Sequence, residues 1–88
     1  MQIGKYTLEG GGACPEQYDV LLGEQVVGYL RLRHGRFRAD CYPAGDHSAK
    51  QTVFTAAPEG DGCFDSDERE KFLTEAVNAI DAYLNKPV

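Results

Sequence analysis

The chain contains no tryptophan, a single methionine and only three cysteines, and its apolar residues never gather into a long run. A membrane-spanning helix needs about 18 or more consecutive apolar residues, and no stretch of this sequence approaches that length. The first nine residues hold one lysine and no continuous apolar region, so they do not fit the pattern of a secretory signal. We therefore expect a cytoplasmic protein without a membrane partner.

The cysteines Cys14, Cys41 and Cys63 are odd in number and form no CxxC pair. This usage is more typical of reduced thiols in the cytosol than of a disulfide scaffold, although it leaves room for one bridge. A zinc site would have to combine them with His34 or His47 from distant parts of the chain, whereas zinc ligands usually come in closely spaced pairs. We expect no metal site and no cofactor.

Catalytic motifs are also missing. The glycines at 10–12 lack both the Lys-Ser/Thr ending of a phosphate-binding loop and the spacing of a dinucleotide fingerprint. Neither histidine has a nucleophile at motif spacing, and Cys63 lies near Asp65 and Asp67, whose negative charges disfavour a reactive thiolate. The sequence therefore predicts no catalytic residue, and we expect that the protein is not an enzyme.

What is present fits one small folded domain over residues 1–88. A chain of this length has one thin core, and 42% hydrophobic with 26% charged residues is ordinary for a globule. Alternation of apolar and polar residues predicts strands. The segments with this alternation are 5–9, 18–22, 26–32, 37–41 and 51–57. We expect an antiparallel sheet of four or five strands.

The dipeptide His34-Gly35 fits a two-residue hairpin turn, because glycine adopts a positive φ freely and histidine tolerates one. Such a turn pairs Leu32 with Phe37 on the apolar face of the sheet, and Leu30 with Ala39. The turn near residues 23–24 is expected to contain three or five residues, because an odd length keeps Tyr18, Val20 and Leu22 on the same face as Leu30.

From about residue 66 the apolar period changes to that of a helix. The apolar stripe consists of Phe72, Leu73, Ala76, Val77, Ile80, Tyr83 and Leu84. Asp65 and Glu68 have the spacing of a helix-capping pair, so the helix should begin within two residues of Ser66. The predicted fold class is α+β, with one C-terminal amphipathic helix packed on one face of the sheet.

Negative charge is concentrated in residues 59–81, which hold eight acids and two bases, whereas the whole chain has a net charge of −5. A solvated helix face is the simpler interpretation. An acidic pole also steers a protein toward a basic partner, so we expect a protein partner with a basic groove. The candidate binding residues of this pole are Asp67, Glu70, Glu75 and Asp81.

A second charged surface is predicted on the outer side of the sheet, from Arg31, Arg33, Arg36 and Arg38, with Tyr29 beside them. The hairpin turn places Arg31 opposite Arg38 and Arg33 opposite Arg36, and like charges in such positions are destabilising. These arginines are either neutralised by Asp19, Asp40 or Glu16, or meet an acidic partner. Direct nucleic-acid binding is not expected of so acidic a protein.

The segment PEGDGCFDSDERE (58–70) matches part of the ligand spacing of a calcium-binding loop. With Gly62 in the place of the loop's glycine, Glu59, Asp61 and Glu68 fall on ligand positions. Ala57 falls where the first carboxylate belongs, and a strand precedes where the entering helix belongs. A helix-capping turn is therefore favoured, and a small ligand-binding or weak calcium-binding domain using residues 59–68 is the alternative.

The succession YDVLLGEQVVGYLRLRHGRFRAD, EGDGCFD and an acidic amphipathic helix resembles small proteins carried by phages and other mobile elements. Size, acidity and the plan of sheet plus helix are similar to those of several anti-CRISPR inhibitors. The resemblance covers most of residues 17–85. It implies a non-catalytic protein that inhibits a host defence complex by occupying one of its surfaces, and it assigns no functional residue.

Overall fold

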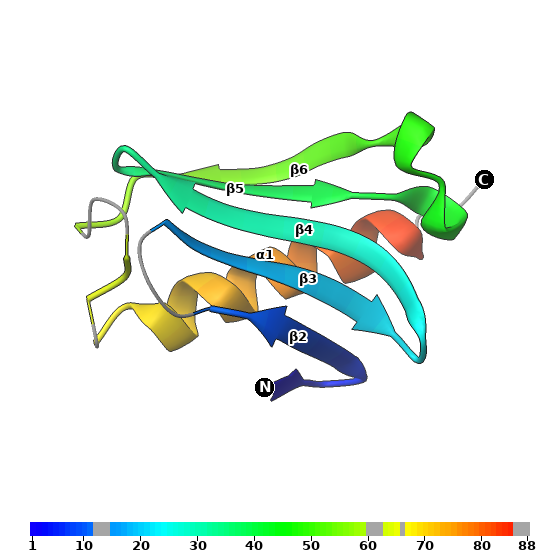
Figure 1. Cartoon of the computed structure of the whole chain (residues 1–88), viewed down its shortest axis with the longest axis horizontal. Coiled ribbons are helices and arrows are strands. Elements are labelled where there is room, and N and C mark those ends of the chain that lie inside the picture. The colour runs from blue at the N-terminus through cyan, green and yellow to red at the C-terminus, as the bar shows by residue number, and fades with distance from the viewer. Residues whose placement is uncertain (12–14, 60–62, 66, 86–88) are drawn as a thin grey trace.

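The computed structural model describes residues 1–11, 15–59, 63–65 and 67–85, which form an antiparallel sheet with one α-helix behind it (Figure 1). The six strands lie side by side in chain order, each antiparallel to the next. They are β1 (Gln2–Ile3), β2 (Tyr6–Gly10), β3 (Glu16–Leu22), β4 (Gln25–Arg33), β5 (Arg36–Cys41) and β6 (Gln51–Ala56). Two 3-10 turns, η1 (Pro43–Gly45) and η2 (His47–Ala49), precede β6, and α1 (Arg69–Leu84) completes the fold. The predicted α+β class and the C-terminal helix are confirmed.

The predicted number of strands is wrong, because the sheet has six strands instead of four or five. The five predicted strands are all present, and the additional one is β1, which pairs with β2 through two residues. Gly4, with a φ of 59°, lies in the turn that joins them. A two-residue strand is too short to show an alternation, so no periodicity in the sequence marks it.

The hairpin between β4 and β5 has the predicted turn and register. His34 and Gly35 form the turn with φ values of 53° and 73°, and Leu32 pairs with Phe37. Leu30 pairs with Ala39, so the apolar residues of both strands share one face.

The turn between β3 and β4 differs from the prediction of three or five residues. It contains only Gly23 and Glu24, with Leu22 opposite Gln25. The register shifts farther along, between Val20 and Leu21. This bulge inserts one residue into β4, and it has the same effect on side-chain direction as an odd loop length.

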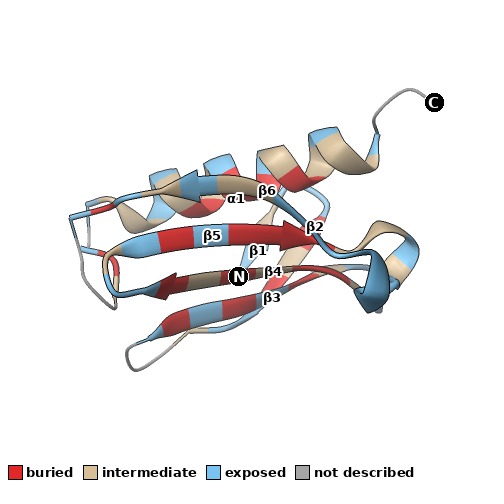
Figure 2. Cartoon of the chain, turned by 90° about the horizontal axis from the view of Figure 1, so that it is seen from above, coloured by how far each residue is buried: buried red, intermediate tan, exposed pale blue. Residues whose placement is uncertain are grey.

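One side of the sheet packs on α1, and this side forms the core (Figure 2). Leu30, Leu32 and Phe37 are at most 1% exposed, as are Leu73 and Ile80 of the helix. The predicted packing of the helix on one face of the sheet is confirmed, and α1 lies mainly against β5 and β6. Within the stripe Phe72 is only partly buried, with its ring 6.4 Å from that of Phe37.

The helix begins at Arg69, one residue beyond the predicted range around Ser66, which itself lies outside the described residues. A turn comes first, in which the N–H groups of Glu68 and Arg69 donate to the carbonyl of Asp65. The Glu68 carboxylate accepts the N–H of Asp65 at 3.0 Å, which is one of the two bonds of the predicted capping pair. Among the described residues, no helix has the length and apolarity needed to cross a membrane.

Candidate functional site

The side of the sheet opposite α1, the outer face, presents the predicted arginines. They alternate along β4 and β5 with buried core residues, so their side chains point away from the helix. Arg31 lies opposite Arg38 and Arg33 lies opposite Arg36, as the hairpin register predicts. Two like-charged pairs on neighbouring strands cost stability. The fold therefore gains nothing from this arrangement by itself.

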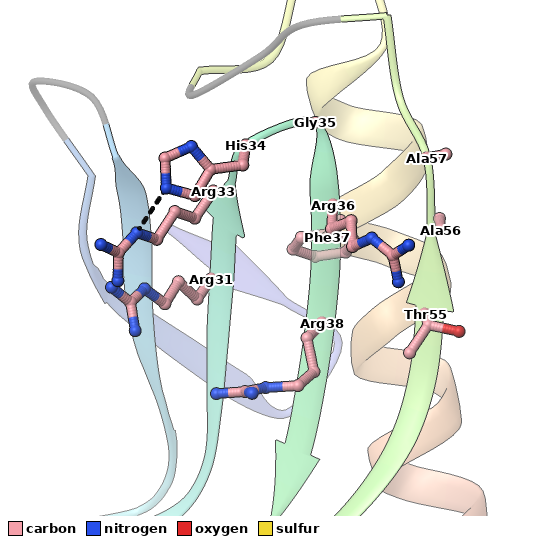
Figure 3. A pocket seen from close by; sticks show the side chains of 10 residues that line it. All are labelled: Arg31, Arg33, His34, Gly35, Arg36, Phe37, Arg38, Thr55, Ala56 and Ala57. Carbon is pink, nitrogen blue, oxygen red and sulfur yellow. Dashed lines mark hydrogen bonds between the residues drawn. The ribbon is translucent and has the colours of Figure 1, made fainter.

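An open hollow of about 810 Å³ lies at the hairpin end of the sheet (Figure 3). We call it the arginine hollow. Its lining combines all four arginines with the turn residues His34 and Gly35, with Phe37 of β5, and with Thr55, Ala56 and Ala57 along and just after β6. The hollow therefore extends from β4 across β5 to the last strand of the sheet.

Most of these guanidinium groups lack a carboxylate partner within the described residues. Arg38 is the exception, because its Nε lies 3.2 Å from Oδ2 of Asp40. The Nε of Arg33 donates to Nε2 of His34 at 3.1 Å. The Nε of Arg31 is buried and has no hydrogen-bond partner in the described part of the chain. Guanidinium groups in this state suit carboxylate or other oxyanion ligands, which they bind with two parallel hydrogen bonds.

Of the three acids expected to neutralise this face, only one forms an ion pair with an outer-face arginine among the described residues. Asp40 does so for Arg38 and is itself 1% exposed. Asp19 is exposed, and none of the ion pairs between described residues includes it. Glu16 lies on the core face and binds Arg69 of α1 instead, so its expected role was wrong. Its alternation with Tyr18 and Val20 already indicates the core face.

Tyr29 occupies the outer face next to Arg31 and lies outside the lining of the arginine hollow. It is half-buried, and its hydroxyl donates to Oε1 of Gln17 at 2.7 Å. The ring of Tyr42, another aromatic near this face, stacks on His47 with centroids 4.1 Å apart. Tyr29 therefore remains accessible in part, at the margin of the arginine hollow.

The predicted acidic pole divides into two groups. Asp67, Glu70 and Glu75 are exposed, and we call them the acidic helix surface. Asp81 instead accepts a hydrogen bond from the Tyr6 hydroxyl at 2.7 Å and lies 3.7 Å from Nζ of Lys5. The bond from Tyr6 is the main cause that holds the pKa of the Asp81 carboxyl below its ordinary value. Asp81 thus connects α1 to β2 and is less available to a partner.

The acidic turn before α1 includes residues 60–62 and 66, which lie outside the described residues. Glu68, one of the proposed calcium ligands, uses its two carboxylate oxygens to accept the N–H groups of Glu59 and Asp65, each at 3.0 Å. Among the described residues, no group of three or more His, Cys, Asp or Glu side chains is placed to hold a metal ion. A hollow of about 350 Å³ adjoins this turn, with Lys71 and Phe72 in its lining.

A buried network around Glu16 was missed by sequence reasoning. Glu16 is 2% exposed and accepts hydrogen bonds from Nε of Arg69 at 2.8 Å, from the N–H of Phe64 at 3.0 Å and from the Tyr18 hydroxyl. Burial opposes ionisation, but these donors outweigh it and hold the pKa of the Glu16 carboxyl below its ordinary value. The pKa of Tyr18 rises to about 12, through burial and through its bond to Glu16. The network attaches the start of α1 to β3.

The two described cysteines are in different states, one in the bridge that the sequence left open and the other reduced as expected. Cys63 is disulfide-bonded, whereas Cys41 is free and fully buried beneath the helix. Cys14 lies outside the described residues. Burial raises the pKa of the Cys41 thiol, and the side chain packs in the core.

Two charged surfaces, the arginine hollow and the acidic helix surface, are thus the candidate binding features among the described residues. Comparisons with protein-family models, with curated proteins and with solved structures find no match to this chain.

Proposed function

We propose that the protein is a non-catalytic protein-interaction module that acts by occupying the surface of a partner protein. One observation carries the proposal. Three of the four arginines that line the arginine hollow have no carboxylate partner among the described residues, although they are aligned as like-charged pairs. A partner that supplies carboxylates would relieve the repulsion and satisfy the buried Nε of Arg31.

The acidic helix surface supports a second contact, with the basic groove of a partner. Glu70 and Glu75 belong to α1, which packs on the side of the sheet opposite the arginine side chains of β4 and β5. Charges of opposite sign on opposite sides orient a protein as it approaches its partner, and they act mainly on the association rate. The arginine hollow remains the better candidate for binding energy, because it is concave and Nε of Arg31 in it is buried.

The biological role that we propose is inhibition of a host defence complex, as in anti-CRISPR inhibitors. Its support is the likeness of size, acidity and sheet-plus-helix plan. A cytoplasmic location belongs to the same proposal. The disulfide at Cys63 weakens that part, because cytosolic thiols are normally kept reduced.

Two matched variants test the proposed surface. Arg31→Gln with Arg36→Gln removes two cations that pair with no carboxylate of the described segments, so neither change leaves a buried carboxylate there unpaired. The triple variant Asp67→Asn, Glu70→Gln, Glu75→Gln removes the acidic helix surface. Each protein is immobilised and exposed to lysate of the cells in which the gene is found, and captured proteins are compared by mass spectrometry.

We expect the arginine variant to lose partners that the wild type and the acidic triple variant retain at moderate salt. Circular dichroism melts confirm that each variant is folded. Equal capture by all three proteins would contradict the proposal. Loss in the acidic variant alone would move the binding surface to α1.

The alternative of a weak calcium-binding turn at residues 59–68 has its own test. A ligand that binds only the folded state raises the melting temperature by mass action. We expect no rise when millimolar calcium is added, because Glu68 already accepts two backbone N–H groups. A clear rise with calcium, absent with the same concentration of magnesium, would favour the alternative.

A further inference from the structure

We propose that the open edge of β6 receives an extended acidic segment of the partner protein as an additional antiparallel or parallel strand, with the segment's carboxylates in the arginine hollow. The inference rests on the proposed function and deepens it, because it states which kind of segment binds and through which atoms. Three features carry it: an open edge, backbone groups directed outward, and cations beside that edge.

The edge at β6 is open. β6 is the last strand in the sheet and pairs only with β5. Among the described residues, no backbone hydrogen bond joins β6 to a segment other than β5. Figure 1 shows β6 along the upper margin of the sheet. The opposite edge is β1, which is only two residues long and offers too short a template.

Hairpin geometry determines which backbone groups of β6 face this edge. Arg33 and Arg36 flank a two-residue turn, so they form a pair that exchanges both hydrogen bonds. Such pairs alternate along the ladder. The N–H of Tyr42, six residues on, accordingly donates to the carbonyl of Val27 at 2.8 Å.

The same alternation gives the direction of the next ladder. Because Arg36 and Arg38 direct their backbone groups to β4, Phe37 and Ala39 direct theirs to β6. Their partners on β6 are Ala56 and Phe54. The N–H and C=O of Thr55, between these two, therefore point to the open edge, and Thr55 is exposed.

The charges beside this edge select an acidic segment. Thr55 lies directly opposite Arg38, and its short side chain separates the edge from the arginines. In Figure 3 the side chain of Arg36 extends toward β6. An added strand would lie about 4.8 Å beyond β6. Its outward side chains would pass over Thr55, where a glutamate can meet the guanidinium of Arg36.

The test uses two synthetic eight-residue peptides, one of alternating Glu and Thr and one of alternating Lys and Thr, with the full chain labelled for NMR. We expect the Glu peptide to shift the Thr55 amide signal and to slow its hydrogen exchange by about tenfold or more, since a bonded amide exchanges only on opening. The Lys peptide should do neither.

Two variants at one position separate backbone pairing from side-chain contact. Thr55→Pro removes the outward N–H, which an edge strand tolerates, and its fold is checked by the core signals of Leu32 and Phe37. Thr55→Val keeps the N–H and the branched shape. We expect the Glu peptide to bind Thr55→Pro about threefold to tenfold more weakly, the effect of one lost hydrogen bond, and Thr55→Val as it binds the wild type.

Each remaining outcome is decisive. Equal binding by wild type and Thr55→Pro, with loss in Arg31→Gln/Arg36→Gln, would overturn strand addition and leave the proposed function standing. Unchanged binding in both Thr55→Pro and Arg31→Gln/Arg36→Gln would overturn strand addition and the proposed function together. Binding of a single-stranded oligonucleotide to the arginines, without protection of Thr55, would replace the acidic segment by a nucleic acid. Dimerisation that protects Thr55 without any peptide would make a second copy the occupant, and it too would overturn the proposal.

Discussion

The two faces of the sheet are built from alternate residues of the same strands, and they differ in how fully their groups are paired. On the core face Leu32 opposes Phe37, and each is at most 1% exposed. On the outer face Arg33 opposes Arg36, and neither has a carboxylate partner among the described residues. Burial of apolar area stabilises the core face, whereas the like-charged pairs of the outer face lower stability. The core face therefore holds the fold, whereas the aligned arginines of the outer face do not stabilise it.

The two buried carboxylates repeat this difference. Glu16, on the core face, accepts bonds from Arg69, from the N–H of Phe64 and from the Tyr18 hydroxyl. Asp40, toward the outer face, accepts one bond from Thr52 at 2.7 Å, and its Oδ2 lies near Arg38 without a hydrogen bond of good geometry. An incompletely satisfied carboxylate is a weaker structural element than a saturated one.

The largest expected effect comes from breaking the core face. Phe37→Ala should lower the free energy of unfolding by about 3 to 5 kcal/mol, because the ring is 1% exposed and packs edge-on against Phe54 and Phe64. Chemical denaturation measures the change. Leu22→Ala is the matched control, since Leu22 is 37% exposed. An unchanged denaturation midpoint for Phe37→Ala would show that this face does not hold the fold.

Glu16→Gln should have the next largest effect. We expect a loss of about 1 to 3 kcal/mol at neutral pH, as charged hydrogen bonds to a partly exposed arginine are replaced by neutral ones. Because the folded pKa of Glu16 is lowered, its stabilisation is complete above the ordinary value of about 4.3. It is lost as the pH falls through the folded pKa.

The unfolding free energy measured between pH 7 and pH 3 should therefore fall less steeply in Glu16→Gln than in the wild type. Glu75→Gln, at an exposed position, serves as the control. Parallel pH curves for the wild type and Glu16→Gln would mean that the Glu16 network contributes no pH-dependent stability.

A third variant, on the outer face, is expected to stabilise the protein. Arg33→Glu places an acid opposite Arg36 and turns a like-charged pair into an opposite pair. Stability should rise by about 0.2 to 1 kcal/mol at low salt, and the gain should shrink in high salt. Arg33→Gln is expected to lie between the two. A loss of stability would mean that the arginines already have favourable surroundings on the outer face.

The smallest expected effect concerns the acidic helix surface. Replacing Asp67, Glu70 and Glu75 by Asn, Gln and Gln should change the unfolding free energy by no more than about 0.5 kcal/mol. Part of that change would come from Asp67, near the positive end of the helix dipole. Thermal melts at two salt concentrations measure it. A loss of more than about 1 kcal/mol would indicate structural contacts for these side chains.

Much of the candidate site could be predicted because it depends on a local turn. Once His34-Gly35 forms a two-residue hairpin turn, the register places Arg31 opposite Arg38, and the alternation of side chains places both on the outer face. The bulge in β4, opposite Val20 and Leu21, could not be predicted, because a bulge and a longer loop have the same effect on side-chain direction. The availability of Asp81 was also misjudged, since its partner Tyr6 lies 75 residues away in the chain.

By itself the sequence determined the α+β class, the hairpin register and the two charged surfaces. Each depends on a period of two or of about 3.6 residues, or on a two-residue turn, and these act over short distances along the chain. Only the tertiary structure decided that Glu16 binds Arg69, 53 residues away, and that β6 forms an open edge beside the arginine hollow. Such contacts depend on how the helix and the last strand pack on the rest, because burial and pairing across the fold are properties of the whole chain.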